Sequence, residues 1–228
     1  MSSLDVRAFT VGPVQENSYI VRADAQSTRA VIVDPGEEAE RLLAAAESLG
    51  VEIEAILITH CHFDHIGAVA PIARATGAPV YCPEIERPVL ADVMSWVPPG
   101  FGPFESYEAD HTVSGGERLS LAGLDIEVLS TPGHSPGHVT YAVSGALLSG
   151  DVLFQGSVGR VDLPGGDWAT LEHSIEGLLR AHPRETVVYP GHMGVTTLGR
   201  EYDTNPFLSE LRARLPHEAT ADAPAQPR

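Results

Sequence analysis

A continuous apolar run, Ala55–Thr59, is the feature that most constrains how this chain can fold. A strand with apolar residues at every position suits a sheet that is covered on both faces. Before this run, leucine and alanine at helical spacing over Glu37–Leu49, followed by Gly50, predict a helix and its end. After it, a second helix is expected over Ile66–Ala75. We therefore expect an α/β fold built in layers.

Short runs rich in β-branched residues, separated by turn residues, predict the remaining strands. These strands are Ala8–Val11, Ser18–Val21, Ala30–Val33, Pro79–Cys82, Arg118–Leu121, Asp125–Leu129, Val139–Val143, Ala146–Ser149 and Thr186–Tyr189. Two later helices are expected, over Trp168–His182 with Asp167 as its cap and over Phe207–Leu215. Residues 92–116 show neither the helical nor the strand periodicity of apolar residues. Two interpretations are open for this segment: a lid or binding loop, or an ordered surface excursion.

Length and composition bound the architecture and the partners. The 228 residues, 43% of them hydrophobic, suffice for one globular domain, which we place at residues 1–215. Residues 216–228, rich in alanine and proline, are expected to be a disordered tail. A formal net charge of −17 argues against nucleic acid and anionic membranes as partners.

The sequence predicts a cytoplasmic protein. No apolar run approaches the roughly 20 residues that a membrane span needs, and the first residues do not resemble a signal peptide. The two cysteines, Cys61 and Cys82, do not make a disulfide framework, which suits a reducing compartment.

Four potential metal ligands follow the apolar run within six residues, in the order His60, His62, Asp64 and His65. Residues two apart at a strand end can point the same way, so His60 and His62 can share one ion. Asp64 and His65 are adjacent and tend to point apart, which suits a second ion. Because a catalytic zinc takes about three protein ligands, four ligands here indicate two metals.

Three further ligands, each preceded by a glycine, stand at the ends of later predicted strands. They are His134, Asp151 and His192. Strand ends are where sites collect in layered α/β folds. The full set is then five histidines and two aspartates. If Asp151 bridges, each ion receives three unshared ligands and one Asp151 oxygen.

This ligand pattern resembles the metallo-β-lactamase fold superfamily, and the chain most resembles the short, single-domain form of hydroxyacylglutathione hydrolase (glyoxalase II). The likeness to that form extends over nearly the whole chain. The segments that carry it are Gly12–Asn17, Gly159–Gly166, Thr197–Glu201 and Asn205–Leu208.

The resemblance implies a four-layer αββα sandwich, with two mixed sheets face to face, helices outside and two divalent metal ions at one edge. One ion would bind His60, His62, His134 and Asp151. The other would bind Asp64, His65, His192 and Asp151. Zinc is the expected metal, and iron or manganese would also suit these ligands.

The implied reaction is hydrolysis of a small-molecule thioester, an S-2-hydroxyacyl thiol such as S-lactoylglutathione, by a hydroxide that bridges the ions. Asp64 and Asp151 are the expected catalytic residues. Two alternatives stay open: a lactonase, and a persulfide dioxygenase with one iron on His60 or His62, His134 and Asp151. A β-lactamase is disfavoured because such enzymes generally lack the bridging aspartate. A non-enzymatic metal protein is disfavoured because structural zinc sites are closed.

Several neighbours of the motif have competing interpretations. Asp34 is either a partner for the second nitrogen of a histidine ligand or a turn aspartate. Cys61 is expected to be a small buried side chain rather than a nucleophile. Arg160 and Arg200 are expected in structural ion pairs rather than at an anionic substrate. We expect three aromatic residues to serve in packing rather than to contact a substrate: Trp96, Phe101 and Phe104. The histidines outside the motif are expected to be structural or exposed: His111, His138, His173, His182 and His217.

Overall fold

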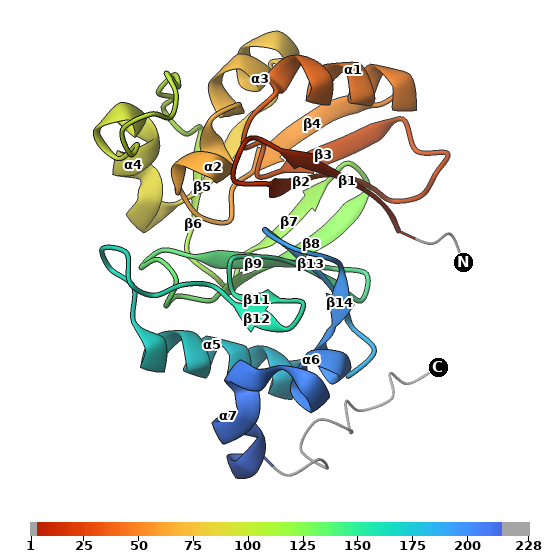
Figure 1. Cartoon of the computed structure of the whole chain (residues 1–228). Coiled ribbons are helices and arrows are strands. Elements are labelled where there is room, and N and C mark those ends of the chain that lie inside the picture. Colours follow the sequence, from red (N-terminus) through yellow and green to blue (C-terminus); the bar gives the residue numbers. More distant parts are fainter. Residues whose placement is uncertain (1–3, 216–228) are drawn as a thin grey trace.

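The computed structural model describes residues 4–215 and has the predicted four layers (Figure 1). Two large mixed sheets pack face to face. Helices α1 (Ala39–Leu49) and α3 (Val69–Thr76) cover the outer face of the first sheet, and α5 (Trp168–Ala181) covers that of the second. None of the helices within residues 4–215 has the length and apolar composition of a membrane-spanning segment. The predicted tail, 216–228, lies outside the described residues.

The first sheet has the strand order β1-β2-β3-β4-β5-β6. Strands β1 to β3 are antiparallel neighbours, whereas β3 to β6 pair in parallel. The strands are β1 (Asp5–Val11), β2 (Glu16–Arg22), β3 (Arg29–Val33), β4 (Glu52–Leu57), β5 (Val80–Pro83) and β6 (His111–Val113).

The second sheet has the order β14-β13-β10-β9-β8-β7 and is antiparallel except for the pair β10–β13. Its strands are β7 (Arg118–Leu121), β8 (Leu124–Ser130), β9 (Val139–Val143), β10 (Ala146–Gly150), β13 (Val187–Pro190) and β14 (Thr196–Thr197). A separate two-stranded sheet, β11 (Leu153–Phe154) and β12 (Ser157–Val158), follows β10.

Alternate side chains of the central strands point to opposite faces, which explains their continuous apolar runs. In β4, Leu57 packs between the two sheets with Tyr141, whereas Ile56 packs outward with Leu42 of α1. Leu147 of β10 likewise packs outward, into the cluster that α5 covers. Each sheet therefore buries both of its faces.

The predicted helix over Ile66–Ala75 is wrong as a single element. It is divided into α2 (Phe63–Ile66) and α3, because the N–H of Ala68 donates to the carbonyl of Pro35 at 3.0 Å instead of continuing the helical ladder. The predicted last helix consists of η3 (Pro206–Leu208) and α7 (Ser209–Arg214).

Several short elements were not predicted. Within residues 92–116 lie η2 (Val93–Ser95) and the whole of β6, and just before them η1 (Glu84–Glu86) and α4 (Arg87–Ala91). Strands β11, β12 and β14 and helix α6 (Leu198–Thr204) were also missed. The caps that were predicted are present: Asp167 accepts from Thr170 N at the start of α5, and Gly50 has a φ of 66° at the end of α1.

Candidate metal centre

Segments after the carboxyl ends of five strands meet at one edge of the sandwich. β3 and β4 are parallel in the first sheet, and β8, β10 and β13 run in one direction in the second. They lead, in that order, to Asp34, residues 58–65, residues 131–138, Asp151 and His192. All seven expected ligands come together there. Their role in binding metal stays a prediction.

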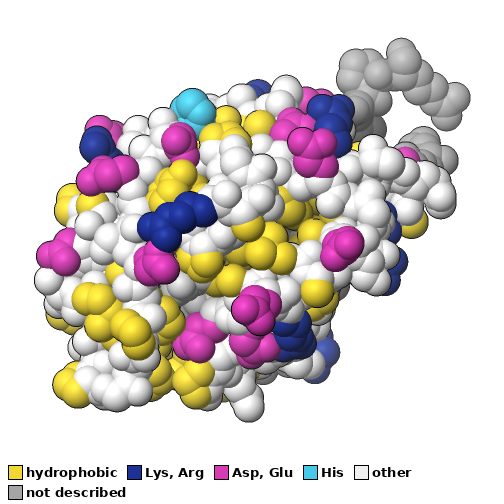
Figure 2. All heavy atoms as spheres, turned by 90° about the horizontal axis from the view of Figure 1, so that it is seen from above, with side chains coloured by type: hydrophobic (Ala, Val, Ile, Leu, Met, Phe, Trp, Pro, Cys, Tyr) yellow, Lys and Arg dark blue, Asp and Glu magenta, His cyan; other side chains and the backbone are white. Residues whose placement is uncertain are grey.

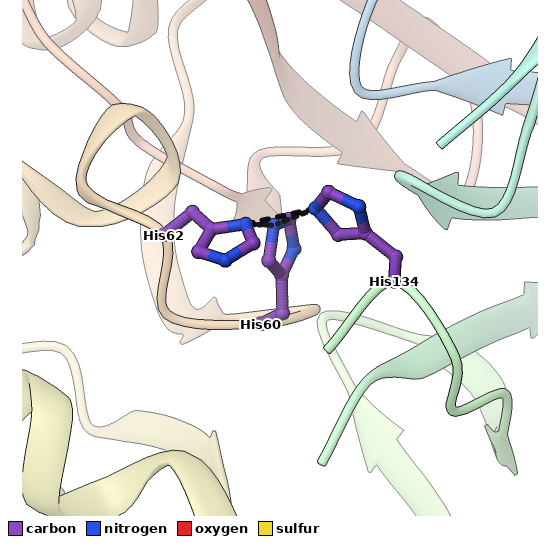
Figure 3. A group of neighbouring side chains, drawn as sticks. All are labelled: His60, His62 and His134. Atoms are coloured by element: carbon purple, nitrogen blue, oxygen red, sulfur yellow. Dashed lines mark hydrogen bonds between the residues drawn. The ribbon is translucent and has the colours of Figure 1, made fainter. Parts of the chain in front are cut away.

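In the first group, the rings of His60, His62 and His134 point toward one another (Figure 3). Nδ1 of His62 lies 3.0 Å from Nε2 of His60 and 2.8 Å from Nε2 of His134, and the two Nε2 atoms are 3.2 Å apart. Nitrogens in a tetrahedral zinc shell, at about 2.0–2.1 Å from the metal, are themselves about 3.3 Å apart. The three nitrogens therefore converge closely enough to bind one ion.

The opposite nitrogens of two of these rings have partners of their own. Nδ1 of His134 donates to the carbonyl oxygen of Arg160 at 2.7 Å. Nδ1 of His60 lies 3.1 Å from Oγ1 of Thr59, whose hydroxyl donates to Asp34 at 2.6 Å. Donation at Nδ1 leaves a lone pair on each Nε2, the atom that faces the other rings.

Two histidines of the first group, His60 and His62, have lowered pKa values. Burial, together with the neighbouring histidines, holds the pKa of His60 well below its usual value. Burial and then His134 lower the pKa of His62 to about 4. Because neutral imidazole is the form that binds metal, these rings are prepared for a cation.

The second group consists of Asp64 and His65 from α2 and of His192 from the segment after β13. Oδ2 of Asp64 lies 3.3 Å from Nε2 of His192 and 3.8 Å from Nε2 of His65. Burial opposes charge on His65, but Asp151 and Asp64 raise its pKa well above the usual value. In this group, the negative charge of the carboxylates is balanced by protonated histidine. A divalent cation that displaces the ring protons would balance the same carboxylates.

Asp151 contacts both groups. Its Oδ2 lies 3.4 Å from Nε2 of His134 and 3.5 Å from Nε2 of His192, and its Oδ1 lies 3.4 Å from Nε2 of His65. Within the described chain, Oδ1 of Asp151 and Nε2 of His65 are buried without a hydrogen-bond partner. Buried polar atoms seldom lack a partner, and a metal ion between these two would satisfy both. The donor set therefore fits metal ions on either side of one carboxylate.

The contact expected between Asp34 and a histidine ring is present. Oδ2 of Asp34 lies 3.1 Å from Nδ1 of His65, and Oδ1 accepts from the N–H of Thr59 at 2.7 Å. Asp34 has a φ of 46° at the end of β3, a conformation that aspartate tolerates better than most residues. Asp34 therefore contacts His65 of the second group directly and is linked to His60 of the first group through Thr59.

Glu86 binds both of the loops that carry the histidines of the first group. Sequence analysis did not identify this residue as part of the site. Its buried carboxylate accepts from Oγ of Ser135 at 2.6 Å and from the N–H of Gly137 at 2.9 Å. Its other oxygen accepts from the N–H of Cys61 at 3.2 Å. Cys61 stands between two of the histidines, and Ser135 follows the third. Because these partners are 25 to 51 positions away, no local pattern indicates the contact.

His138 also belongs to the surroundings of the site. It is buried, its Nε2 accepts from the N–H of Asp151 at 3.1 Å, and its ring stacks on His60 with 4.9 Å between centroids. Its expected structural role thus includes holding the segment that carries Asp151. The other histidines outside the motif are exposed or partly buried at His111, His173 and His182, and His217 lies outside the described residues.

A cavity of about 570 Å³ opens beside the two groups. His62, Asp64, His134, Asp151 and His192 line it, together with apolar side chains. Trp96 is among these and is 57% exposed, so the expectation that it serves packing is wrong. Phe101 and Phe104 do pack, against Phe63, with centroids 4.7 and 6.2 Å away.

Two further expectations about single residues are confirmed, and a third is wrong. Arg160 forms an ion pair with Asp162. Cys61 is a buried free thiol whose sulfur lies 3.5 Å from that of Cys82. Arg200 forms no ion pair with any residue between 4 and 215.

A sequence profile described as the metallo-beta-lactamase superfamily matches residues 11–192. The "Probable metallo-hydrolase YqgX" of Bacillus subtilis is 41% identical over 210 residues, covering 89% of this chain and 97% of the relative. "Hydroxyacylglutathione hydrolase GloC" of Haemophilus influenzae is 33% identical over 211 residues, covering 90% and 99%.

Solved structures of similar fold cover nearly the same part of the chain. The "BLEG-1 B3 metallo-beta-lactamase" has a TM-score of 0.84 at 39% identity, covering 90% of this chain and 100% of the other. "TTHA1623 in a di-iron-bound form" has a TM-score of 0.72 at 43% identity, covering 89% and 100%. "ETHE1 from Myxococcus xanthus" has a TM-score of 0.75 at 26% identity, covering 95% and 88%.

Proposed function

This chain belongs to the metallo-β-lactamase superfamily, and we propose that it hydrolyses a thioester at a centre of two divalent metal ions. The single observation that carries the dinuclear proposal is the place of Asp151, whose carboxylate faces histidines of both groups. A carboxylate that lies between two sets of three donors can bind one ion on each side and so serve as their shared ligand.

The thioester comes from the relatives. A hydroxyacylglutathione hydrolase is similar to this chain over almost its whole length, and a thioester carbonyl requires the same attack by water as other hydrolysable acyl groups. Zinc stays our first choice of metal. Iron is supported as an alternative by the di-iron form of a structural neighbour.

We propose the following residues as ligands. One ion would bind His60, His62, His134 and Asp151, and the other would bind Asp64, His65, His192 and Asp151. When bound, the ions would supply a water of lowered pKa and a Lewis acid for the carbonyl oxygen.

The protein's own side chains orient and shelter the reaction. Asp64 lies against His192 at the cavity, so its carboxylate is placed to accept a hydrogen bond from an attacking water and to orient it. Asp151 and Asp64 are our proposed catalytic residues. Val89 and Trp96 line the same cavity and exclude bulk water from one side of the substrate.

A second candidate, a persulfide dioxygenase with one iron, is supported by part of the same donor set. His62, His134 and Asp151 place two imidazoles and one carboxylate together, a set that non-haem iron oxygenases use. The two candidates require different numbers of metal ions and only the second requires oxygen.

Anaerobic turnover separates these candidates. Protein of measured metal content is mixed with S-lactoylglutathione, and the thioester absorbance is followed without oxygen, beside metal-stripped and reconstituted samples. We expect hydrolysis that depends on metal. Oxygen consumption with a thiol persulfide by protein holding one iron, without thioester cleavage, would instead establish the dioxygenase. A chromogenic cephalosporin and a lactone are assayed in parallel, and preference for either contradicts the thioesterase.

A further inference from the structure

Beyond the candidate ligands, the cavity is walled by apolar side chains. Ile85 belongs to η1, Val89 to α4, and Trp96 follows η2, while Leu163 and Pro164 come from the segment before α5. Ile85 is 65% exposed and Trp96 is 57% exposed. Large apolar side chains that are exposed together at one cavity mark a surface that a ligand covers.

Basic side chains are scarce at this cavity. The 228-residue sequence contains no lysine. Arg160 is the one arginine among the residues that line the cavity within the described chain, and its Nε and Nη2 donate to the two carboxylate oxygens of Asp162 at 2.6 and 2.7 Å. Of the three carboxylates that line the same cavity, those of Asp64 and Asp151 are proposed metal ligands, whose charge bound ions would balance, and that of Glu86 accepts three hydrogen bonds.

The other described arginines are engaged as well except Arg200, which forms no ion pair and does not line the cavity. Of the thirteen arginines between residues 4 and 215, eleven form ion pairs. Arg212 donates to the carbonyls of Tyr202 and Asn205. Figure 2 shows one face of the molecule, where basic side chains form separate spots, most of them beside Asp or Glu.

The binding of an anionic thiol carrier depends on basic side chains. Proteins bind carboxylates and phosphates through arginine or lysine, often with two hydrogen bonds to one group. A carrier with carboxylates would meet here one arginine, and two of its nitrogens already donate to Asp162. It would also meet an acidic protein whose net charge is −17. An uncharged carrier needs no arginine and is not repelled by the acidic protein, and it can cover the exposed apolar side chains of the cavity.

We propose that the substrate part occupying this cavity is uncharged and apolar, so that the enzyme selects thioesters of neutral thiols over those of anionic thiols such as glutathione. This inference rests on the proposed thioester hydrolysis and specifies its substrate class. Ile85 and Trp96 are then specificity-determining residues that contact the thiol or acyl chain.

A pair of thioesters that differ in one charge tests the inference. The lactoyl thioesters of 3-mercaptopropionamide and 3-mercaptopropionate have nearly the same size, and only the second carries a carboxylate. With the metal-loaded full chain, we expect kcat/KM to be at least about tenfold higher for the amide, through a lower KM. The difference should shrink as salt is added, because screening weakens charge repulsion. S-lactoylglutathione should behave like the carboxylate.

A charge placed at the cavity provides a second test. Ile85→Arg adds an arginine at a side chain that is already exposed, so the fold should tolerate it. We expect this variant to narrow or reverse the preference for the amide. Phe207→Arg is the matched control, because Phe207 is 49% exposed and does not line the cavity. The control should keep the parent's preference.

The outcomes separate this inference from the proposed function. Equal rates for the two thioesters, or faster cleavage of the carboxylate or of S-lactoylglutathione, would overturn the inference and leave a thioesterase. An Ile85→Arg variant with an unchanged preference would also contradict it. Failure to cleave any of the three thioesters with two metal ions bound would overturn the proposed function itself.

Discussion

The side chains of Asp151 and His65 face each other at 3.4 Å, from Oδ1 to Nε2, and in the described chain neither atom has a hydrogen-bond partner. The two residues come from different sheets, Asp151 after β10 and His65 after β4. Two buried polar atoms that are aimed at each other but lack hydrogen bonds indicate a shared cation. This relationship is the basis of the two-metal proposal.

Removal of the Asp151 carboxylate should affect both metal positions. In Asp151→Ala we expect bound metal to fall from about two ions per chain to one or fewer, and kcat/KM to fall by more than about 100-fold. Metal is measured by mass spectrometry of the purified, dialysed protein. Asp125→Ala, an exposed aspartate in β8, is the control and should keep full metal. Parental metal content and activity in Asp151→Ala would contradict the shared ligand.

Glu86 should support activity without binding metal. Glu86→Gln keeps the size of the side chain but weakens three hydrogen bonds to the loops around His60 and His134. We expect kcat or metal affinity to fall by about tenfold, as for partners that orient metal ligands. Glu84→Gln, in the same short helix but exposed, should change neither. A parental Kd for zinc and a parental kcat in Glu86→Gln would refute this role.

Gly191 is required by close packing against the site. A Cβ at this position would lie 2.2 Å from Oδ1 of Asp151 and 2.7 Å from Cε1 of His65. Gly191→Ala should therefore displace both side chains and lower metal affinity and kcat by about tenfold or more, as overpacking does to a tight core. Gly177→Ala is the control, because a Cβ there meets nothing within 4 Å. It should raise stability by up to about 1 kcal/mol, since Gly177 lies inside α5.

The ion pair between Asp5 and Arg22 should make stability depend on pH. Burial raises the pKa of Asp5, but hydrogen bonds from Arg22 and Arg7 outweigh this and lower it. A lowered pKa in the folded state contributes stability above the unfolded pKa of about 3.8, and the contribution is lost as pH falls further.

Asp5→Asn should therefore cost about 2 kcal/mol at pH 7, as for a charged hydrogen bond to a buried partner, and much less at pH 3. Urea unfolding at both pH values measures this. Glu176→Gln removes an exposed helical pair with Arg180 and should cost less than about 0.5 kcal/mol. An equal cost for Asp5→Asn at both pH values would show that charge does not matter here.

The layered fold could be predicted because its cause is local. Strands β3 and β4 are apolar on both faces, and that pattern requires a covering layer on each side. The ligand residues could be found for the same reason, since each stands next to a strand end. The break between α2 and α3 was not predictable, because it depends on a hydrogen bond from Ala68 to Pro35, far away in the sequence.

The surroundings of the site escaped prediction for a related reason. Glu86 and His138 act through partners that only the assembled fold brings near. Trp96 lies in a segment without periodicity, and its exposure follows from how residues 84–98 fold over the cavity edge. Sequence patterns therefore identified the candidate ligands but not the side chains that position them.

The dependence of activity on metal stoichiometry tests the central claim most directly. Chelator-stripped protein is titrated anaerobically with zinc, and separately with ferrous iron, while the hydrolysis of a lactoyl thioester is measured at each addition. A centre that shares Asp151 predicts that the rate keeps rising until two equivalents per chain are bound. A rate that reaches its maximum at one equivalent, or that persists in the stripped protein, would contradict the two-metal hydrolase.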